Sequence, residues 1–151
     1  MPLCVVVRRA QDRLVIPFIT RGSVMPQPVV HFELPADDVE RARTFYRDAF
    51  GWNVITVPDM DYTLLGTATT TDDMGRPTAA GEINGGMFAR TEDLTQPLIT
   101  IAVEDIDAAL TKVEQCGGKT LRGRQAVGDM GFTGYFSDSE GTVVGLWQNA
   151  G

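Results

Sequence analysis

The only histidine of the chain, His31, stands two residues before Glu33 in the stretch VVHFEL. Successive side chains of a β-strand point to opposite faces, so a strand here puts His31 and Glu33 on one face and the apolar neighbours on the other. An imidazole can act as a general base near neutral pH, and a carboxylate beside it can orient it or accept the proton itself. His31 and Glu33 are therefore candidate catalytic residues. The alternative, an inert hydrogen-bonded pair, stays open.

A second candidate lies near the C-terminus, where Gly145 and Trp147 share a face by the same alternation. A glycine gap beside a large ring suits stacking of a flat ligand, although the ring could equally fill that space itself. Further candidates for lining a ligand cleft lie on other expected strands, with core packing as the alternative for each: Tyr62, Met87, Leu98, Thr100 and Tyr135.

These candidates fall within an internal repeat. The segment that begins HFELPADDVERA recurs as LITIAVEDIDAA, at a constant offset of 67 positions, as from His31 to Leu98. The same offset places Asp38 on Asp105 and Gly51 on Gly118. In each copy a strand-like run precedes an acidic pair, a helical apolar pattern and a glycine stop. Such repetition predicts two copies of one supersecondary unit.

Strand-like stretches with turn signals between them follow each expected helix. They are 52–57, 62–69 and 83–89 in the first copy, and 119–121, 131–137 and 142–148 in the second. The expected fold class is therefore α+β, with two βαβββ modules that form curved mixed sheets around a cleft. Module one spans about 28–90 and module two about 96–149, within a single domain at 25–151. Residues 1–24 are expected to be an N-terminal extension, or alternatively an added strand or arm.

Composition excludes several classes of partner. The 151 residues are 43% hydrophobic and 22% charged, which is typical of a globular domain, and the net charge is −7. An acidic chain repels phosphate backbones and anionic lipid, so neither nucleic acid nor a membrane is an expected partner. Cys4 and Cys116 form no metal-binding or disulfide pattern, which favours the cytoplasm.

The ordered pattern of motifs resembles the vicinal oxygen chelate superfamily, the glyoxalase, bleomycin-resistance and extradiol dioxygenase group. The motifs are His31, DVE at 38–40, FY at 45–46, FGW at 50–52, FSDSEG at 136–141 and GLW at 145–147. The resemblance covers about residues 28–149. The HFELPADD opening and the GGM segment at 85–87 are similar to a branch of small glyoxalase-like proteins of unassigned activity.

The resemblance also implies where a metal would bind. Metalloenzymes of this superfamily hold one divalent ion with four ligands from the first and last strands of each module. The matching positions here are His31, Gly85 or Gly86, Leu98 and Gly145. Glycine and leucine have no donor side chain, and a transition metal needs three or four imidazole, thiolate or carboxylate ligands. We therefore expect no metal and no other cofactor, although a weak site at His31 and Glu33 is an alternative.

The expected function is binding of an apolar or aromatic small molecule, as the bleomycin-resistance members do without a metal. The alternative is a metal-independent lyase, isomerase or hydrolase that uses His31 and Glu33 for proton transfer. A third possibility is an accessory domain with an emptied cleft. The resemblance further implies a homodimer.

Overall fold

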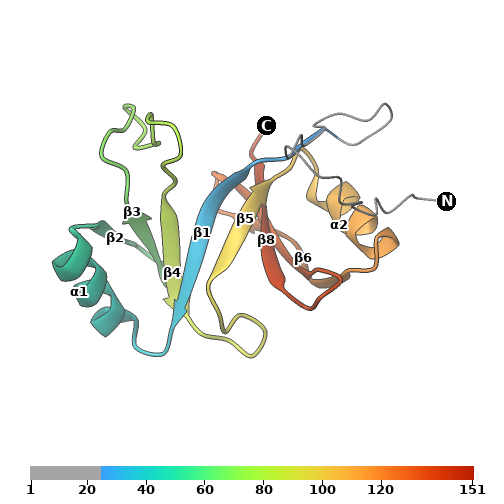
Figure 1. Ribbon diagram of the computed structural model, residues 1–151, viewed down its shortest axis with the longest axis horizontal. Helices are drawn as coiled ribbons and strands as arrows, with labels where there is room; N and C mark the ends of the chain where they lie inside the picture. Colours follow the sequence, from blue (N-terminus) through green and yellow to red (C-terminus); the bar gives the residue numbers. More distant parts are fainter. Residues whose placement is uncertain (1–24) are drawn as a thin grey trace, which may run out of the picture.

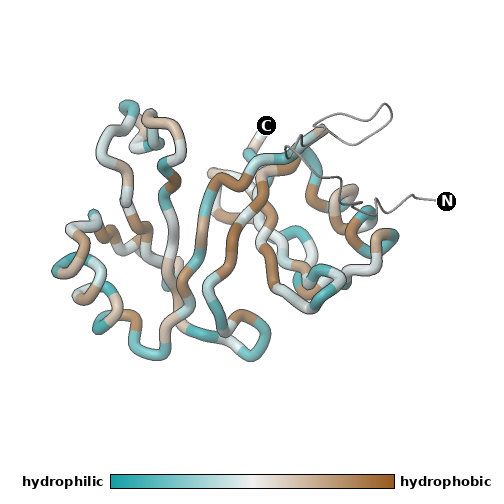
Figure 2. Tube along the Cα trace, viewed as in Figure 1, coloured by the Kyte–Doolittle hydropathy of each residue, from teal (hydrophilic) through white to brown (hydrophobic). Residues whose placement is uncertain are grey.

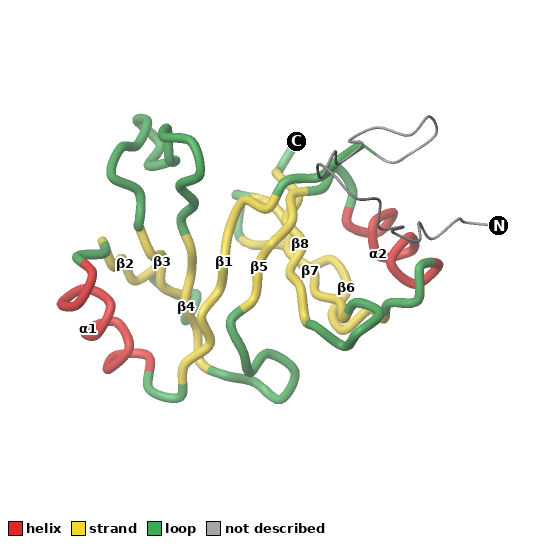
Figure 3. The backbone as a smooth tube through the Cα atoms, in the orientation of Figure 1, coloured by secondary structure: helices red, strands yellow, loops and turns green. Residues whose placement is uncertain are grey.

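The computed structural model describes residues 25–151, so the expectation about an extension at 1–24 concerns residues outside the described part of the chain. Two copies of a strand–helix–three-strand unit follow one another (Figures 1 and 3). The first comprises β1 (Val29–Ala36), α1 (Val39–Phe50), β2 (Asn53–Val57), β3 (Tyr62–Gly66) and β4 (Gly85–Ala89). The second comprises β5 (Leu98–Ala102), α2 (Ile106–Gln115), β6 (Lys119–Val127), β7 (Gly131–Ser137) and β8 (Val143–Asn149).

All eight strands form one mixed sheet in the order β2-β3-β4-β1-β5-β8-β7-β6. Within each unit the first and last strands run parallel, β1 beside β4 and β5 beside β8. The units meet where β1 pairs antiparallel with β5. The first and last strands of both modules are therefore the four central strands of the sheet. The expected α+β fold with two βαβββ modules is confirmed.

The helices begin and end where the repeat predicts. Asp38 and Asp105 cap them, and each side chain accepts a hydrogen bond from the backbone N–H three residues on, which would otherwise have no partner. Gly51 ends α1 with a φ of 68°, a left-handed conformation that a residue without Cβ adopts at little cost. None of the helices in the described part of the chain has the length and apolar character needed to cross a membrane.

The two modules bury their helices differently. In module two, Ile106 and Leu110 of α2 pack into an apolar cluster with Phe136, Val144 and Leu146 of the sheet. In module one, α1 buries no residue completely. The repeat places Arg43 at the position of Leu110, and its Nε donates to Oγ1 of the fully buried Thr63 at 2.7 Å. A polar contact thus replaces an apolar one, and α2 is the more hydrophobic of the two helices along its trace (Figure 2).

One expected strand is longer than its sequence pattern suggests. β6 extends from Lys119 to Val127, whereas the apolar alternation predicts only 119–121. Its pairing with β7 is irregular, with shifts of register on both sides of Arg122. Such bulges re-aim the side chains that follow them. The direction of Arg122 is therefore not predictable from alternation along the strand.

Candidate functional site

A buried carboxylate lies at the centre of the sheet face opposite the helices. Tyr62 Oη donates to Glu33 Oε1 at 3.0 Å, and Tyr135 Oη donates to Glu33 Oε2 at 2.9 Å. His31 Nε2 lies 2.9 Å from the same Tyr62 hydroxyl. When Tyr62 gives its single proton to Glu33, the imidazole must donate at Nε2. We call His31, Glu33, Tyr62 and Tyr135 the Glu33 cluster.

Burial controls the ionisation of this cluster. Desolvation raises the pKa of Glu33, while the phenol hydrogen bonds and the charge of Arg122 oppose the shift. Desolvation lowers the pKa of His31 to about 4, so the imidazole is neutral at physiological pH. Burial also raises the pKa of Tyr62 and of Tyr135, and in both the nearby charge of Glu33 adds to the shift. The cluster is thus a set of neutral donors around one carboxylate that has an increased proton affinity.

A glycine makes room for the Tyr62 phenol. Gly86 of β4 aligns with Glu33 in the sheet register, and a Cβ built on it would lie 1.7 Å from Tyr62 Oη. Any larger residue at this position would therefore collide with the hydroxyl. Gly85 faces the other side, where its Cβ would meet the ring of Phe32 at 2.3 Å. Of the two glycines that the sequence offers, Gly86 is the one on the cluster face.

A hollow of about 270 Å³ borders the cluster. The two phenols of the cluster, Tyr62 and Tyr135, form part of its wall. The rest is mainly apolar, with one cation and two other polar residues: Met60, Phe88, Ala89, Leu94, Arg122, Thr91 and Asp61. The Tyr62 and Phe88 rings are close to parallel, with 15° between their planes and 6.2 Å between their centroids. Such walls accept a flat apolar molecule.

Arg122 is held at the rim by a carboxylate. Its Nε donates to Asp93 Oδ2 at 2.7 Å, and its Nη2 donates to Asp93 and to Thr91 Oγ1. The hydrogen bond with Arg122 holds the pKa of Asp93 below its usual range. The guanidinium carbon lies 5.6 Å from the centre of the Tyr135 ring, within cation–π range. Arg122 is therefore oriented beside the cluster.

The structure brings several predicted site residues onto this face. Leu98 is buried and aligns with Glu33, while Thr100 aligns with both His31 and Gly145. Thr100 Oγ1 is buried without a hydrogen-bond partner among residues 25–151, and a Cβ on Gly145 would lie 2.8 Å from it. Leu98, Thr100 and Gly145 thus lie on the cluster face of the sheet but do not line the hollow.

Two residues that the sequence predicted to bind a ligand, Met87 and Trp147, do not line the hollow. Met87 is fully buried on the helix side, aligned with Leu34, because alternation from Gly86 turns it to the opposite face. Trp147 covers Gly131, whose Cβ would lie 2.8 Å from the indole. The indole N–H donates to Asn149 Oδ1 at 2.8 Å, and the ring does not line the hollow.

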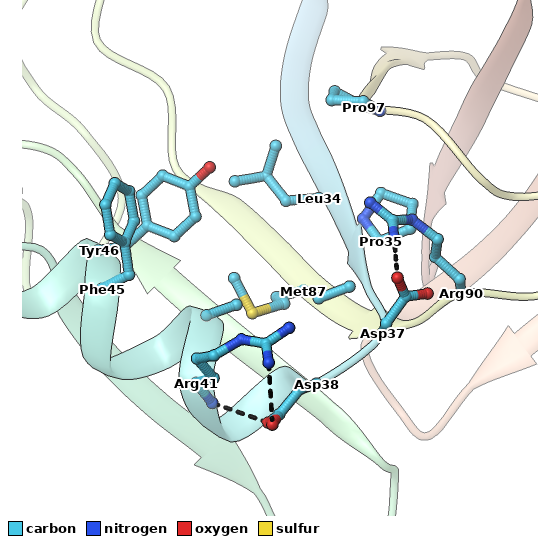
Figure 4. A pocket seen from close by; sticks show the side chains of 12 residues that line it. Leu34, Pro35, Asp37, Asp38, Arg41, Phe45, Tyr46, Met87, Arg90 and Pro97 are labelled. Carbon is cyan, nitrogen blue, oxygen red and sulfur yellow. Dashed lines mark hydrogen bonds and ion pairs between the residues drawn. The ribbon is translucent and has the colours of Figure 1, made fainter.

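Met87 instead contributes to a separate pocket of about 420 Å³, which lies between α1 and the helix-side face of β1 (Figure 4). Leu34, Phe45 and Tyr46 are among its apolar walls. Arg90, bound to Asp37, lies at one end, and Arg41 beside Asp38 lies at another. This pocket lies on the opposite face of the sheet from the Glu33 cluster.

The donor set does not fit the metal that the superfamily resemblance implies. At the four expected positions, only His31 carries a ligand side chain. The space in front of Gly86 belongs to the Tyr62 phenol, and Leu98 and Gly145 offer no donor. Both oxygens of Glu33 already accept hydrogen bonds from phenols. Among residues 25–151 no three His, Cys, Asp or Glu side chains come together in a way that would hold an ion.

Two important residues, Arg122 and Phe88, were not among the predicted site residues. Tyr135 was among the candidates for lining the cleft, and its register opposite Gly145 identifies its face. Arg122 follows a bulge, and Phe88 shares its face with Gly86 by alternation. Only Phe88 and Tyr135 carried a usable signal in the sequence, namely their spacing from the glycines.

Comparisons with known proteins agree with this fold. A family model described as "Bleomycin resistance protein-like N-terminal" matches residues 29–68. A glyoxylase-like domain-containing protein of Didymella fabae is 31% identical over 124 residues, which are 79% of this chain and 91% of that protein. CFP32, a glyoxylase-named protein of Mycobacterium tuberculosis (strain CDC 1551 / Oshkosh), is 28% identical over 130 residues. That match covers 77% of this chain but spans only 43% of CFP32.

Among solved structures, a glyoxalase/bleomycin resistance protein/dioxygenase superfamily member from Vibrio splendidus 12B01 superposes with a TM-score of 0.52. It is 17% identical, and the match covers 82% of this chain and 99% of that one. At this identity the agreement is one of fold.

Proposed function

Because this chain belongs to the glyoxalase and bleomycin-resistance group of the vicinal oxygen chelate superfamily, we propose that it binds a small, flat, largely apolar molecule without a metal. The ligand occupies the hollow in front of the Glu33 cluster. The observation that carries this proposal is the position of that hollow, with apolar walls and the two cluster phenols on one side. Ligand sites of proteins combine such walls with a few fixed polar groups.

The proposed absence of a metal rests on the chemistry of the donor set. A divalent transition ion at His31 would keep water in most of its coordination sphere, and the Tyr62 phenol fills the space in front of Gly86. Elemental analysis of protein purified without chelators is expected to find less than one zinc, nickel, iron or manganese per chain. A stoichiometric ion that is lost in His31→Ala would contradict the proposal.

The site of binding is tested by filling the hollow. Met60 lines it from the turn between β2 and β3 and is partly exposed, so Met60→Trp is expected to fold and to exclude the ligand. Met130, exposed in the corresponding turn between β6 and β7 but outside the hollow, gives the matched control Met130→Trp. Native mass spectrometry and calorimetric titration of a library of aromatic compounds are expected to show binding to the wild type and the control only. Equal binding to Met60→Trp would place the ligand elsewhere.

A second function is favoured by one specific observation, the buried carboxylate of Glu33. Burial raises its pKa, and two phenols fix both its oxygens, which are features of a general base in an enclosed site. His31 would then act through Tyr62, because its Nε2 contacts that hydroxyl and not Glu33. In this reading the protein is a metal-independent lyase or isomerase with Glu33 as the base.

The variant Glu33→Gln distinguishes an enzyme from a binding protein. An enzyme loses turnover while ligand affinity changes little, since the amide retains the shape of the side chain and can still accept from a phenol. A binding protein shows no turnover in either form. The homodimer implied by the resemblance stays a prediction, which light scattering coupled to gel filtration tests.

A further inference from the structure

We propose that the hollow selects aromatic alcohols, with the ligand hydroxyl held between the Tyr135 oxygen and the Arg122 guanidinium. This inference rests on the proposed function, since it names the class of ligand that the same hollow binds. The ligand O–H donates to Tyr135 Oη, and the ligand oxygen accepts from Arg122. A hydroxyl group can make both bonds at once.

The first half of this arrangement follows from counting hydrogen-bond partners at the two phenols. Each phenol has one proton to donate and two lone pairs. Tyr135 donates its proton to Glu33, at 2.9 Å from Oε2. The Tyr62 oxygen lies in the same cluster but already contacts His31 Nε2 at 2.9 Å. Tyr135, which lines the hollow, accepts none of the hydrogen bonds that the structure shows among residues 25–151, so it has more acceptor capacity left for a ligand than Tyr62, which keeps one lone pair.

The second half follows from the orientation of Arg122. Its Nε and Nη2 are occupied by Asp93 and Thr91. Its Nη1 has no hydrogen-bond partner within residues 25–151, and the guanidinium lies 5.6 Å from the centre of the Tyr135 ring. Arg122 is also the only cation among the residues that line the hollow. The acceptor and the donor for the ligand thus belong to two neighbouring residues that both line the hollow.

The rest of the hollow fits the ring of such a ligand. Phe88, Leu94 and Met60 supply apolar contacts, and the near-parallel rings of Tyr62 and Phe88 favour a flat molecule. The volume of about 270 Å³ is just below the usual range for ligand sites, which suits a small molecule of one or two fused rings. The charge of Arg122 also favours an oxygen that carries partial negative charge.

The test compares 2-naphthol with 2-methoxynaphthalene, which has the same rings but no O–H to donate. Calorimetric titration of the whole chain is expected to show about tenfold tighter binding of the alcohol, the effect of one net hydrogen bond. In Tyr135→Phe the two compounds are expected to bind alike, because the acceptor oxygen is gone. Tyr46→Phe removes a phenol of α1 outside the hollow, and it is expected to keep the tenfold ratio.

Each result decides the question. Equal affinities for the two compounds on the wild type overturn recognition of the hydroxyl, while binding itself still supports a ligand site. A tenfold ratio that persists in Tyr135→Phe assigns the acceptor to another residue and also overturns the proposal. Failure of both compounds to bind rejects the hollow as a ligand site. The comparison on the wild type remains decisive even where Tyr135→Phe does not fold.

Discussion

Gly86→Ala tests the geometry of the Glu33 cluster most directly. The added methyl carbon would lie 1.7 Å from Tyr62 Oη and 2.1 Å from Cζ of the same ring, so the ring has to move. It cannot move without losing its contacts with His31 at 2.9 Å and with Glu33 at 3.0 Å. The substitution thus breaks two hydrogen bonds through a single methyl group at another residue.

The size of the destabilisation follows from the two hydrogen bonds that are lost. A neutral hydrogen bond contributes about 1 kcal/mol net and one to a charged group about 2 kcal/mol, so their loss lowers the free energy of unfolding by about 3 kcal/mol. Glu33, only 6% exposed, keeps Tyr135 as a donor, which limits the damage. Displacement of the Tyr62 ring from its stack with Phe88 adds to the loss. Gly86→Ala is therefore expected to destabilise more than Tyr62→Phe, which keeps the ring in place.

Urea unfolding followed by circular dichroism measures the effect. The matched control is Gly123→Ala, because a Cβ on Gly123 has no atom within 4 Å and its φ lies outside the left-handed region. The control is expected to stay within about 0.5 kcal/mol of the wild type. An unfolding midpoint of Gly86→Ala equal to that of the control would refute the placement of Tyr62 over Gly86.

Three further predictions concern the ionisation of His31 and the packing of the helices. Because the pKa of His31 is lowered from 6.5 to about 4, its contribution to stability is complete above pH 6.5 and is lost as the pH falls towards 4, by up to about 3 kcal/mol. Urea unfolding at both pH values should show this loss in the wild type and not in His31→Gln; an equal loss in both would contradict it. Arg43→Leu is expected to destabilise by about 1–2 kcal/mol, since Thr63 Oγ1 loses its donor in a buried site. Adding Thr63→Val is expected to recover most of that loss in a double-mutant cycle, and additive losses would argue against the contact. Leu110→Ala is expected to cost about 2–5 kcal/mol in thermal or urea unfolding, because Leu110 is 6% exposed in the core of module two, and a change below 1 kcal/mol would argue against that packing.

The sequence by itself determined the two modules and the position of their helices. The repeat at a constant offset, the capping aspartate Asp105 and the glycine stop at Gly51 are local signals, and the structure follows each of them; the cap of α1, Asp38, lies one residue after the expected Asp37. Alternation within one strand also placed His31 and Glu33 on the same face, as observed. These features depend only on neighbours along the chain. Local physics is sufficient to specify them.

Contacts between strands far apart in the chain were decided by the tertiary structure. Tyr62 and Tyr135 reach Glu33 from β3 and β7, which are 29 and 102 positions away, and no local pattern sets the register between those strands. The bulges in β6 turn Arg122 towards the rim, and the small size of Gly86 admits a phenol from the neighbouring strand. Met87 and Trp147 lie outside the hollow for the same reason. Alternation fixes a side chain relative to its own strand, whereas the register and curvature of the whole sheet decide what that side chain meets.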